Sequence, residues 1–161
     1  MSRLRPALSE DLPRVRAIVE AAYSPYLVRM GQPPQPMLDD YAARLAAGEL
    51  QVLEEDGRVI GLLVLLARPD SLLIHNVAVD PAAKGKGHGR TLMIAAEAAA
   101  RDRGYRRLTL YTHITMTENQ AIYRHYGWRE EARIEEGGFQ RIYFAKDLPS
   151  LDHETGQDPK G

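Results

Sequence analysis

A glycine-rich turn near the middle of the chain constrains the fold more than any other feature. It reads Lys84-Gly85-Lys86-Gly87-His88-Gly89. The β-branched run before it, Leu72 to Val79, predicts a strand, and the pattern from Gly89 to about Arg103 predicts a helix that Gly104 ends. Because a helix that crosses between strands requires at least one parallel strand pair, the turn indicates an α/β chain with a mixed sheet.

The composition of this turn is that of a diphosphate site. Alternate glycines leave backbone N–H groups unshielded, the helix start adds a partial positive charge, and Lys84, Lys86 and Arg90 add full charges. A Rossmann fingerprint would need glycine where Arg90 stands, and the spacing of a Walker loop is missing. The alternative, a tight connection without a ligand, explains the glycines but not the three interleaved cations.

The remaining patterns predict helices and hairpins on both sides of the turn. An Asp56-Gly57 pair and a Gly137-Gly138 pair each separate two β-rich runs, which is typical of hairpins. The other expected strands are 4–8, 50–53, 59–66, 108–112, 128–134 and 139–145. The other expected helices are 9–23, 37–47 and 117–126, with a Pro-rich, non-helical segment at 31–36 inside a long loop from 26 to 37.

Length and composition bound the class of protein. The 161 residues allow one domain, expected over 1–149, followed by a polar tail over 150–161 that we expect to be disordered. A net charge of −1 gives no general attraction to nucleic acid or an anionic membrane. The longest apolar stretch, Val59 to Ala67, falls well short of the about 20 residues that span a bilayer, so we expect a cytoplasmic protein. Cysteine is absent, which excludes disulfides, thiolate metal sites and a cysteine nucleophile.

Two separated motifs together resemble a known family. The glycine-rich turn resembles the pyrophosphate loop of the GNAT superfamily of N-acetyltransferases, with Lys84 where Gln or Arg is usual. Downstream, Asn119, Tyr123, Gly127 and Trp128 resemble its second conserved motif. The resemblance covers about residues 3–148. It implies the acyl-CoA N-acyltransferase fold, with about seven mostly antiparallel strands, one splayed parallel pair and about four flanking helices.

The resemblance implies acetyl-CoA as cosubstrate and assigns residues to it. Backbone groups of two strand residues would face pantetheine, the turn would bind the pyrophosphate, and the later helix would lie near the pantetheine arm. The residues implied are Val77 and Val79; Lys84, Gly85, Lys86, Gly87, His88, Gly89 and Arg90; and Asn119 and Tyr126.

The resemblance also implies direct acetyl transfer to an amine in a ternary complex. Tyr123 matches the family's general acid, although an aromatic packed on a short helix is the alternative. Histone-type members carry a glutamate base where this chain has Leu73. His75, two residues on, matches a histidine of arylalkylamine N-acetyltransferases and could be the base, since imidazole titrates near neutrality. A structural role for His75 is equally open, and His113 is a second candidate.

The acceptor is expected to bind beside the first two helices. Tyr23, Tyr26 and Met30 gather there with Met37, although plain core is the alternative. Binding of a cationic acceptor is one interpretation of Asp39, Asp40 and Glu118, but we expect solvated surface for each. The acceptor would be a small-molecule or peptide amine; no metal, nucleic acid or membrane is expected, and a homodimer is compatible with the family. The competing hypotheses are a non-catalytic acyl-CoA-binding module and a small nucleotide-binding kinase, whose Walker and magnesium residues are missing.

Overall fold

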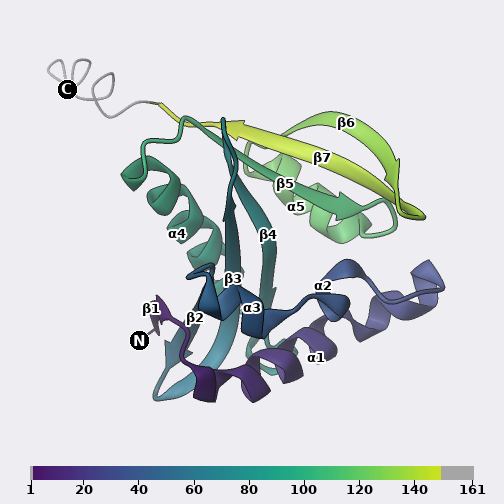
Figure 1. The fold of residues 1–161 in the computed structure, drawn as a ribbon. Coiled ribbons are helices and arrows are strands. Elements are labelled where there is room, and N and C mark those ends of the chain that lie inside the picture. The colour runs from purple at the N-terminus through teal and green to yellow at the C-terminus, as the bar shows by residue number, and fades with distance from the viewer. Residues whose placement is uncertain (1, 150–161) are drawn as a thin grey trace, which may run out of the picture. The chain divides into compact units, whose positions relative to one another are not determined.

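A computed structural model describes residues 2–149 (Figure 1), and its strands form one seven-stranded mixed sheet. The strand order is β1-β2-β3-β4-β5-β7-β6, with one parallel pair and otherwise antiparallel neighbours, which confirms the predicted sheet. The strands are β1 Ser2–Pro6, β2 Leu50–Glu55, β3 Arg58–Ala67, β4 Leu72–Val79, β5 Arg107–His113, β6 Arg129–Glu136 and β7 Phe139–Asp147. The α-helices are α1 Leu12–Met30, α2 Gln35–Leu38, α3 Tyr41–Ala46, α4 His88–Asp102 and α5 Thr117–His125, with 3₁₀ turns at Ser9–Asp11 and Pro81–Ala83.

The described residues divide into two units that alternate along the chain. The first consists of residues 2–66 with Ile74–Ala95, and the second of Ala67–Leu73 with residues 96–149. We describe each unit by itself, and the single domain expected over 1–149 stays a prediction. The predicted tail, 150–161, lies outside the described residues. None of the helices in the described part of the chain is long and apolar enough to cross a membrane.

In the first unit, β3 forms the centre of the core. Every residue from Val59 to Leu66 is buried, because the strand is covered on both faces. On β3, a Cβ added at Gly61 would lie 3.3 Å from Leu92 Cδ1 of α4 and 3.1 Å from the Ala78 carbonyl oxygen. The missing side chain thus lets α4 approach the sheet closely.

In the second unit, β5, β7 and β6 form an antiparallel ladder with one buried face. Leu108, Leu110, Ile142 and Phe144 bury that face, and α5 packs on it through Tyr123, whose ring centroid lies 5.7 Å from that of Phe144. The outer strand β6 is mostly exposed and rich in alternating charges, which discourages pairing with further strands.

The structure corrects the predicted end of the first helix. We expected it to stop near Tyr23 and a long loop to begin at Tyr26, but α1 continues through Pro25 to Met30. Gly31, with φ 73°, is the residue that ends it, and its N–H donates to the Leu27 carbonyl at 2.9 Å. Left-handed backbone of this kind is what glycine provides after a helix.

The second predicted helix, 37–47, is wrong as a continuous element. Asp39 and Asp40 have extended backbone between α2 and α3, and Asp40 Oδ1 accepts a hydrogen bond of 3.1 Å from Ala43 N. By capping the first turn of α3 in this way, the Asp40 side chain favours a helix start at this point over a helix that continues through it. Pro36 lies in the first turn of α2, where its missing N–H has no cost, so the non-helical segment ends before residue 35. The first strand is shifted as well, to Ser2–Pro6.

Candidate functional site

The predicted phosphate turn leads from β4 to α4 in the first unit. Gly85 and Gly87 have φ of 85° and 81°, and an added Cβ would meet no atom within 4 Å at either position. Thr91 N bonds the Gly87 carbonyl at 3.0 Å, whereas the N–H groups from Gly85 to Gly89 donate to no carbonyl of residues 2–149. Lys84, Lys86 and Arg90 are exposed. The turn therefore offers unpaired donors, a helix start and cations to an anion.

The start of this turn is anchored by Asp80. Its Oδ1 accepts from Ala82 N at 3.0 Å, and its Oδ2 accepts from Arg14 Nη2 of α1 at 2.5 Å. The Ala82 bond and then Arg14 hold the pKa of the Asp80 carboxyl below its usual range. Arg14 Nε also donates to the Val59 carbonyl of β3 at 2.9 Å, so the turn is fixed to a helix and a strand.

The side chain of His88 is buried at the end of the turn. This residue opens α4, and its side chain is 6% exposed. Its Nε2 lies 3.6 Å from Glu55 Oε1 of β2 and makes no hydrogen bond within the described residues. The ring is therefore part of the packing under the turn.

Neighbouring residues of β4 face opposite sides of the strand. Val77 and Val79 are half-buried and the His75 side chain is 9% exposed, whereas Asn76 and Ala78 are buried. This alternation places Asn76 on the face of β4 opposite to that of His75.

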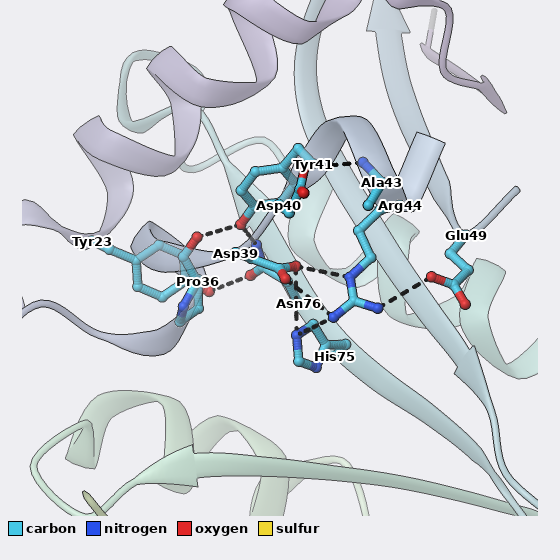
Figure 2. Close-up of polar contacts among 10 residues, drawn as sticks. All are labelled: Tyr23, Pro36, Asp39, Asp40, Tyr41, Ala43, Arg44, Glu49, His75 and Asn76. Atoms are coloured by element: carbon cyan, nitrogen blue, oxygen red, sulfur yellow. Dashed lines mark hydrogen bonds and ion pairs between the residues drawn. The ribbon is translucent and has the colours of Figure 1, made fainter. Parts of the chain in front are cut away.

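Asn76 joins two tyrosines in a hydrogen-bonded chain (Figure 2). Tyr23 OH donates to Asn76 Oδ1 at 2.6 Å, Asn76 Nδ2 donates to Tyr41 OH at 3.0 Å, and Tyr41 OH donates to the Pro36 carbonyl at 2.5 Å. Burial raises the pKa of Tyr41, so its phenol keeps the proton that it donates to the Pro36 carbonyl. Tyr23 OH also lies 3.3 Å from the Val77 carbonyl, one of the strand groups predicted to face pantetheine.

His75 belongs to a second polar cluster (Figure 2). Arg44 of α3 donates to both oxygens of Asp39, at 3.0 and 3.1 Å, and to Glu49 Oε1 at 3.2 Å. His75 Nε2 lies 3.3 Å from Arg44 Nη2 and 3.5 Å from Asp39 Oδ2. The Asp39 side chain is 7% exposed, which overturns our expectation of a solvated surface residue.

A cavity of about 310 Å³ opens beside this cluster in the first unit. Its lining residues are Arg16, Val19, Glu20, Met37, Asp39 and Tyr41. The predicted acceptor residues lie further along α1: Tyr26 packs near Tyr23 with a centroid distance of 6.3 Å, and Met30 is the last residue of the helix. Only Met37 of the predicted acceptor cluster lines the cavity. Sequence reasoning missed Glu20 and Tyr41, whose spacing resembles that of ordinary helix residues.

In the second unit, Tyr123 of α5 lies between two aromatic rings. Its centroid is 6.1 Å from Trp128 and 5.7 Å from Phe144, and Trp128 N donates to the Tyr123 carbonyl at 3.0 Å. Asn119 is half-buried on the same helix, whereas Tyr126, just past its end, is 46% exposed. These contacts fix the orientation of the Tyr123 ring.

His113, at the end of β5, has its δ nitrogen occupied. Nδ1 accepts from Thr115 N at 3.1 Å and lies 2.9 Å from Thr115 Oγ1. A neutral ring that accepts at Nδ1 carries its proton on Nε2, so neither nitrogen offers a free lone pair. Burial and then Arg141 lower the pKa of His113, which further opposes protonation.

Metal ligands do not gather in the described part of the chain. Among residues 2–149, no group of three or more His, Asp or Glu side chains is placed to hold a metal ion.

Comparison with known proteins gives the family. The model of the acetyltransferase (GNAT) family matches residues 13–128, and the chain therefore belongs to this family of acyltransferases. A mouse protein named N-alpha-acetyltransferase 80 is 43% identical over 65 residues, 40% of this chain and 19% of that protein. A mycothiol acetyltransferase of Jonesia denitrificans is 31% identical over 104 residues, 63% of this chain and 31% of that protein. The chain thus spans less than a third of the length of these two relatives.

Solved structures confirm the predicted fold. The ribosomal-protein-S18-alanine N-acetyltransferase of Escherichia coli superposes with a TM-score of 0.73 at 21% identity, covering 94% of this chain and 96% of the other. A GNAT family acetyltransferase of Elizabethkingia anophelis with acetyl-CoA bound gives a TM-score of 0.68 at 20% identity, covering 91% and 98%. At these identities the likeness establishes the acyl-CoA N-acyltransferase fold.

Proposed function

We propose that this protein is an acetyl-CoA-dependent N-acetyltransferase that transfers the acetyl group directly to a primary amine in a ternary complex. The observation that carries the proposal is the turn from β4 to α4, where unpaired N–H groups, two left-handed glycines and three cations meet at a helix start. This combination suits the diphosphate of acetyl-CoA. The absence of cysteine removes an acetyl-cysteine intermediate and favours direct transfer.

Acetyl-CoA would lie along β4 and the turn. Residues 84–90 would bind the pyrophosphate, and the backbone of Val77 and Val79 would face pantetheine. Asn119 and Tyr126 would contact the pantetheine arm. The ion pair between Asp80 and Arg14 supports this arrangement, because it holds the turn in place before the ligand binds.

The reaction needs a base for the acceptor and an acid for the leaving group. An amine with a pKa near about 10 must lose a proton before it attacks the thioester, and the departing thiolate gains from a proton. We assign the base to His75 and the acid to Tyr123. Burial and then Arg141 lower the pKa of His113, which makes it the weaker base and supports His75.

The acceptor we propose is a small-molecule or peptide primary amine. The names of the similar proteins include acetyltransferases of protein amino groups and of mycothiol. In this chain, the Glu20 carboxylate beside Arg16 and the apolar Val19 and Met37 suits an amine on a partly apolar body. We further infer a cytoplasmic enzyme that needs no metal.

Initial-rate kinetics test this function. CoA release would be followed while acetyl-CoA and an amine are both varied, with peptides that begin with alanine and small amines as acceptors. Direct transfer predicts reciprocal plots that intersect. Tight acetyl-CoA binding without CoA release for any acceptor would instead favour the non-catalytic acyl-CoA-binding module.

A further inference from the structure

Two charged side chains contact the same ring atom of His75. Arg44 Nη2 lies 3.3 Å and Asp39 Oδ2 3.5 Å from Nε2 (Figure 2). A guanidinium can only donate, and an ionised carboxylate can only accept. The arginine therefore suits a ring with its lone pair at Nε2, and the aspartate suits a ring with a proton there. Nε2 has a partner within reach in both protonation states.

The charges around this ring make both states accessible. Within residues 2–149, Asp39 between α2 and α3 and Arg44 on α3 contact His75, and Glu49 before β2 contacts Arg44. With a neutral ring the four side chains carry one net negative charge, and a proton on His75 neutralises it. Because the His75 and Asp39 side chains are only 9% and 7% exposed, solvent screens their interaction weakly.

We propose that Asp39 and Arg44 are positioning residues that set the protonation of His75 in opposite directions. The Asp39 carboxylate stabilises the imidazolium. The Arg44 guanidinium stabilises the neutral ring with its proton on Nδ1. The link to catalysis rests on the function proposed above, in which His75 takes the proton of the acceptor amine. Holding that proton leaves the cluster without net charge, and the ring can release it again.

A titration of the histidine rings by NMR tests the inference without any substrate. The full chain would be labelled in its histidines, and the His75 signal identified by its loss in His75→Gln. Asp39→Asn removes the negative charge and should lower the titration midpoint of His75 by about one pH unit. Arg44→Gln removes the positive charge and should raise the midpoint by about as much.

A neighbouring carboxylate provides the matched control. Asp40→Asn makes the same charge change one residue away, at an exposed helix cap that asparagine also fills well, so the His75 midpoint should stay at the wild-type value. A shift in the same direction for Asp39→Asn and Arg44→Gln would overturn the proposal. So would an Asp39→Asn shift no larger than that of Asp40→Asn.

The nitrogen shifts and a conservative variant complete the test. Above the midpoint, the ¹⁵N shifts of His75 should report a proton on Nδ1; a proton on Nε2 would contradict the assignment to Arg44. If circular dichroism shows that Arg44→Gln does not fold, Arg44→Lys keeps the cation and should leave the midpoint nearer to wild type than Asp39→Asn does. A midpoint displaced further than in Asp39→Asn would count against the proposal.

The pH profile of turnover connects the cluster to catalysis. A base must be neutral to act, so the rising limb of kcat/KM with pH should move down in Asp39→Asn, up in Arg44→Gln and not at all in Asp40→Asn. A merely structural role would lower activity without moving the limb. Failure of wild-type turnover with every acceptor would contradict the proposed function alone, since the ring titration requires no reaction.

Discussion

The two proposed catalytic side chains are held by different means. His75 contacts the charged side chains of Asp39 and Arg44. The ring of Tyr123 packs against the aromatic rings of Trp128 and Phe144. A general acid that protonates a leaving thiolate needs a fixed position, and packing against the two rings fixes the plane of the Tyr123 ring.

Removing the Tyr123 hydroxyl tests its role as the acid. Tyr123→Phe keeps the ring packing and should lower kcat by a factor of about 100 or more, because general acid catalysis contributes on this scale. The affinity for acetyl-CoA, measured by calorimetry, should stay nearly unchanged. Steady-state kinetics with one amine acceptor give kcat for both proteins.

The matched control for this variant is Tyr105→Phe. Tyr105 OH donates to the Arg68 carbonyl at 3.1 Å. Tyr105→Phe therefore removes the same hydroxyl group from a tyrosine with a structural role. Turnover should be retained there. Equal kcat values for Tyr123→Phe and wild type would remove Tyr123 from the mechanism if a pre-steady-state burst is absent, since product release is then not limiting.

At the scale of elements, two glycines at the ends of α4 allow the role of the turn to be tested. Gly87 and Gly104 flank this helix with nearly equal φ, 81° and 82°, and an added Cβ meets no atom within 4 Å at either position. Their local surroundings match, but only Gly87 belongs to the predicted phosphate turn. A substitution pair can therefore separate backbone strain from ligand binding.

Aspartate at these two positions gives that separation. Gly87→Asp and Gly104→Asp should each destabilise the fold by about 1–2 kcal/mol, because both force a side chain into left-handed backbone. Only Gly87→Asp should abolish acetyl-CoA binding, since its carboxylate opposes the phosphates. Thermal unfolding and calorimetric titration with acetyl-CoA measure the two effects. Equal acetyl-CoA affinity in both variants would contradict the assignment of the turn.

At the scale of the whole molecule, ion pairs make stability depend on pH. Arg5 donates to both oxygens of Asp11, at 2.8 and 3.2 Å, and Leu8 N donates to one of them at 2.8 Å. The Arg5 bonds and then the Leu8 bond hold the pKa of Asp11 below its usual range. A depressed carboxyl pKa stabilises the fold above about pH 4, and this contribution is lost as the pH falls through the folded-state value.

Asp11→Asn tests this dependence. The variant should lose about 2 kcal/mol of unfolding free energy at pH 7, because it breaks charge-assisted hydrogen bonds of a buried carboxylate. Its stability should also fall less steeply than that of wild type below pH 4. Urea unfolding at several pH values measures both. Asp70→Asn, at an exposed position, should follow the wild-type curve; a parallel curve for Asp11→Asn would refute the assignment.

For the molecule as a whole, the sequence could predict the order of the elements but not the contacts of the site. The order of strands and helices around the turn follows from local signals, periodicity and glycines, and the structure confirms it. The cluster at His75 could not be predicted, because the burial of Asp39 depends on a helix break and on Arg44, which lies five residues further on and reaches back to it. The tautomer of His113 likewise depends on a backbone N–H of Thr115.

The most direct test of the central claim is whether each released CoA corresponds to one acetylated amine. Purified protein would be incubated with acetyl-CoA and a panel of primary amines, including peptides that begin with alanine. Released thiol and acetylated product would be measured in the same samples by absorbance and mass spectrometry. We predict equal amounts of both for at least one amine. CoA release without any acetylated amine, or no release despite acetyl-CoA binding, would contradict acetyl transfer as the function of this protein.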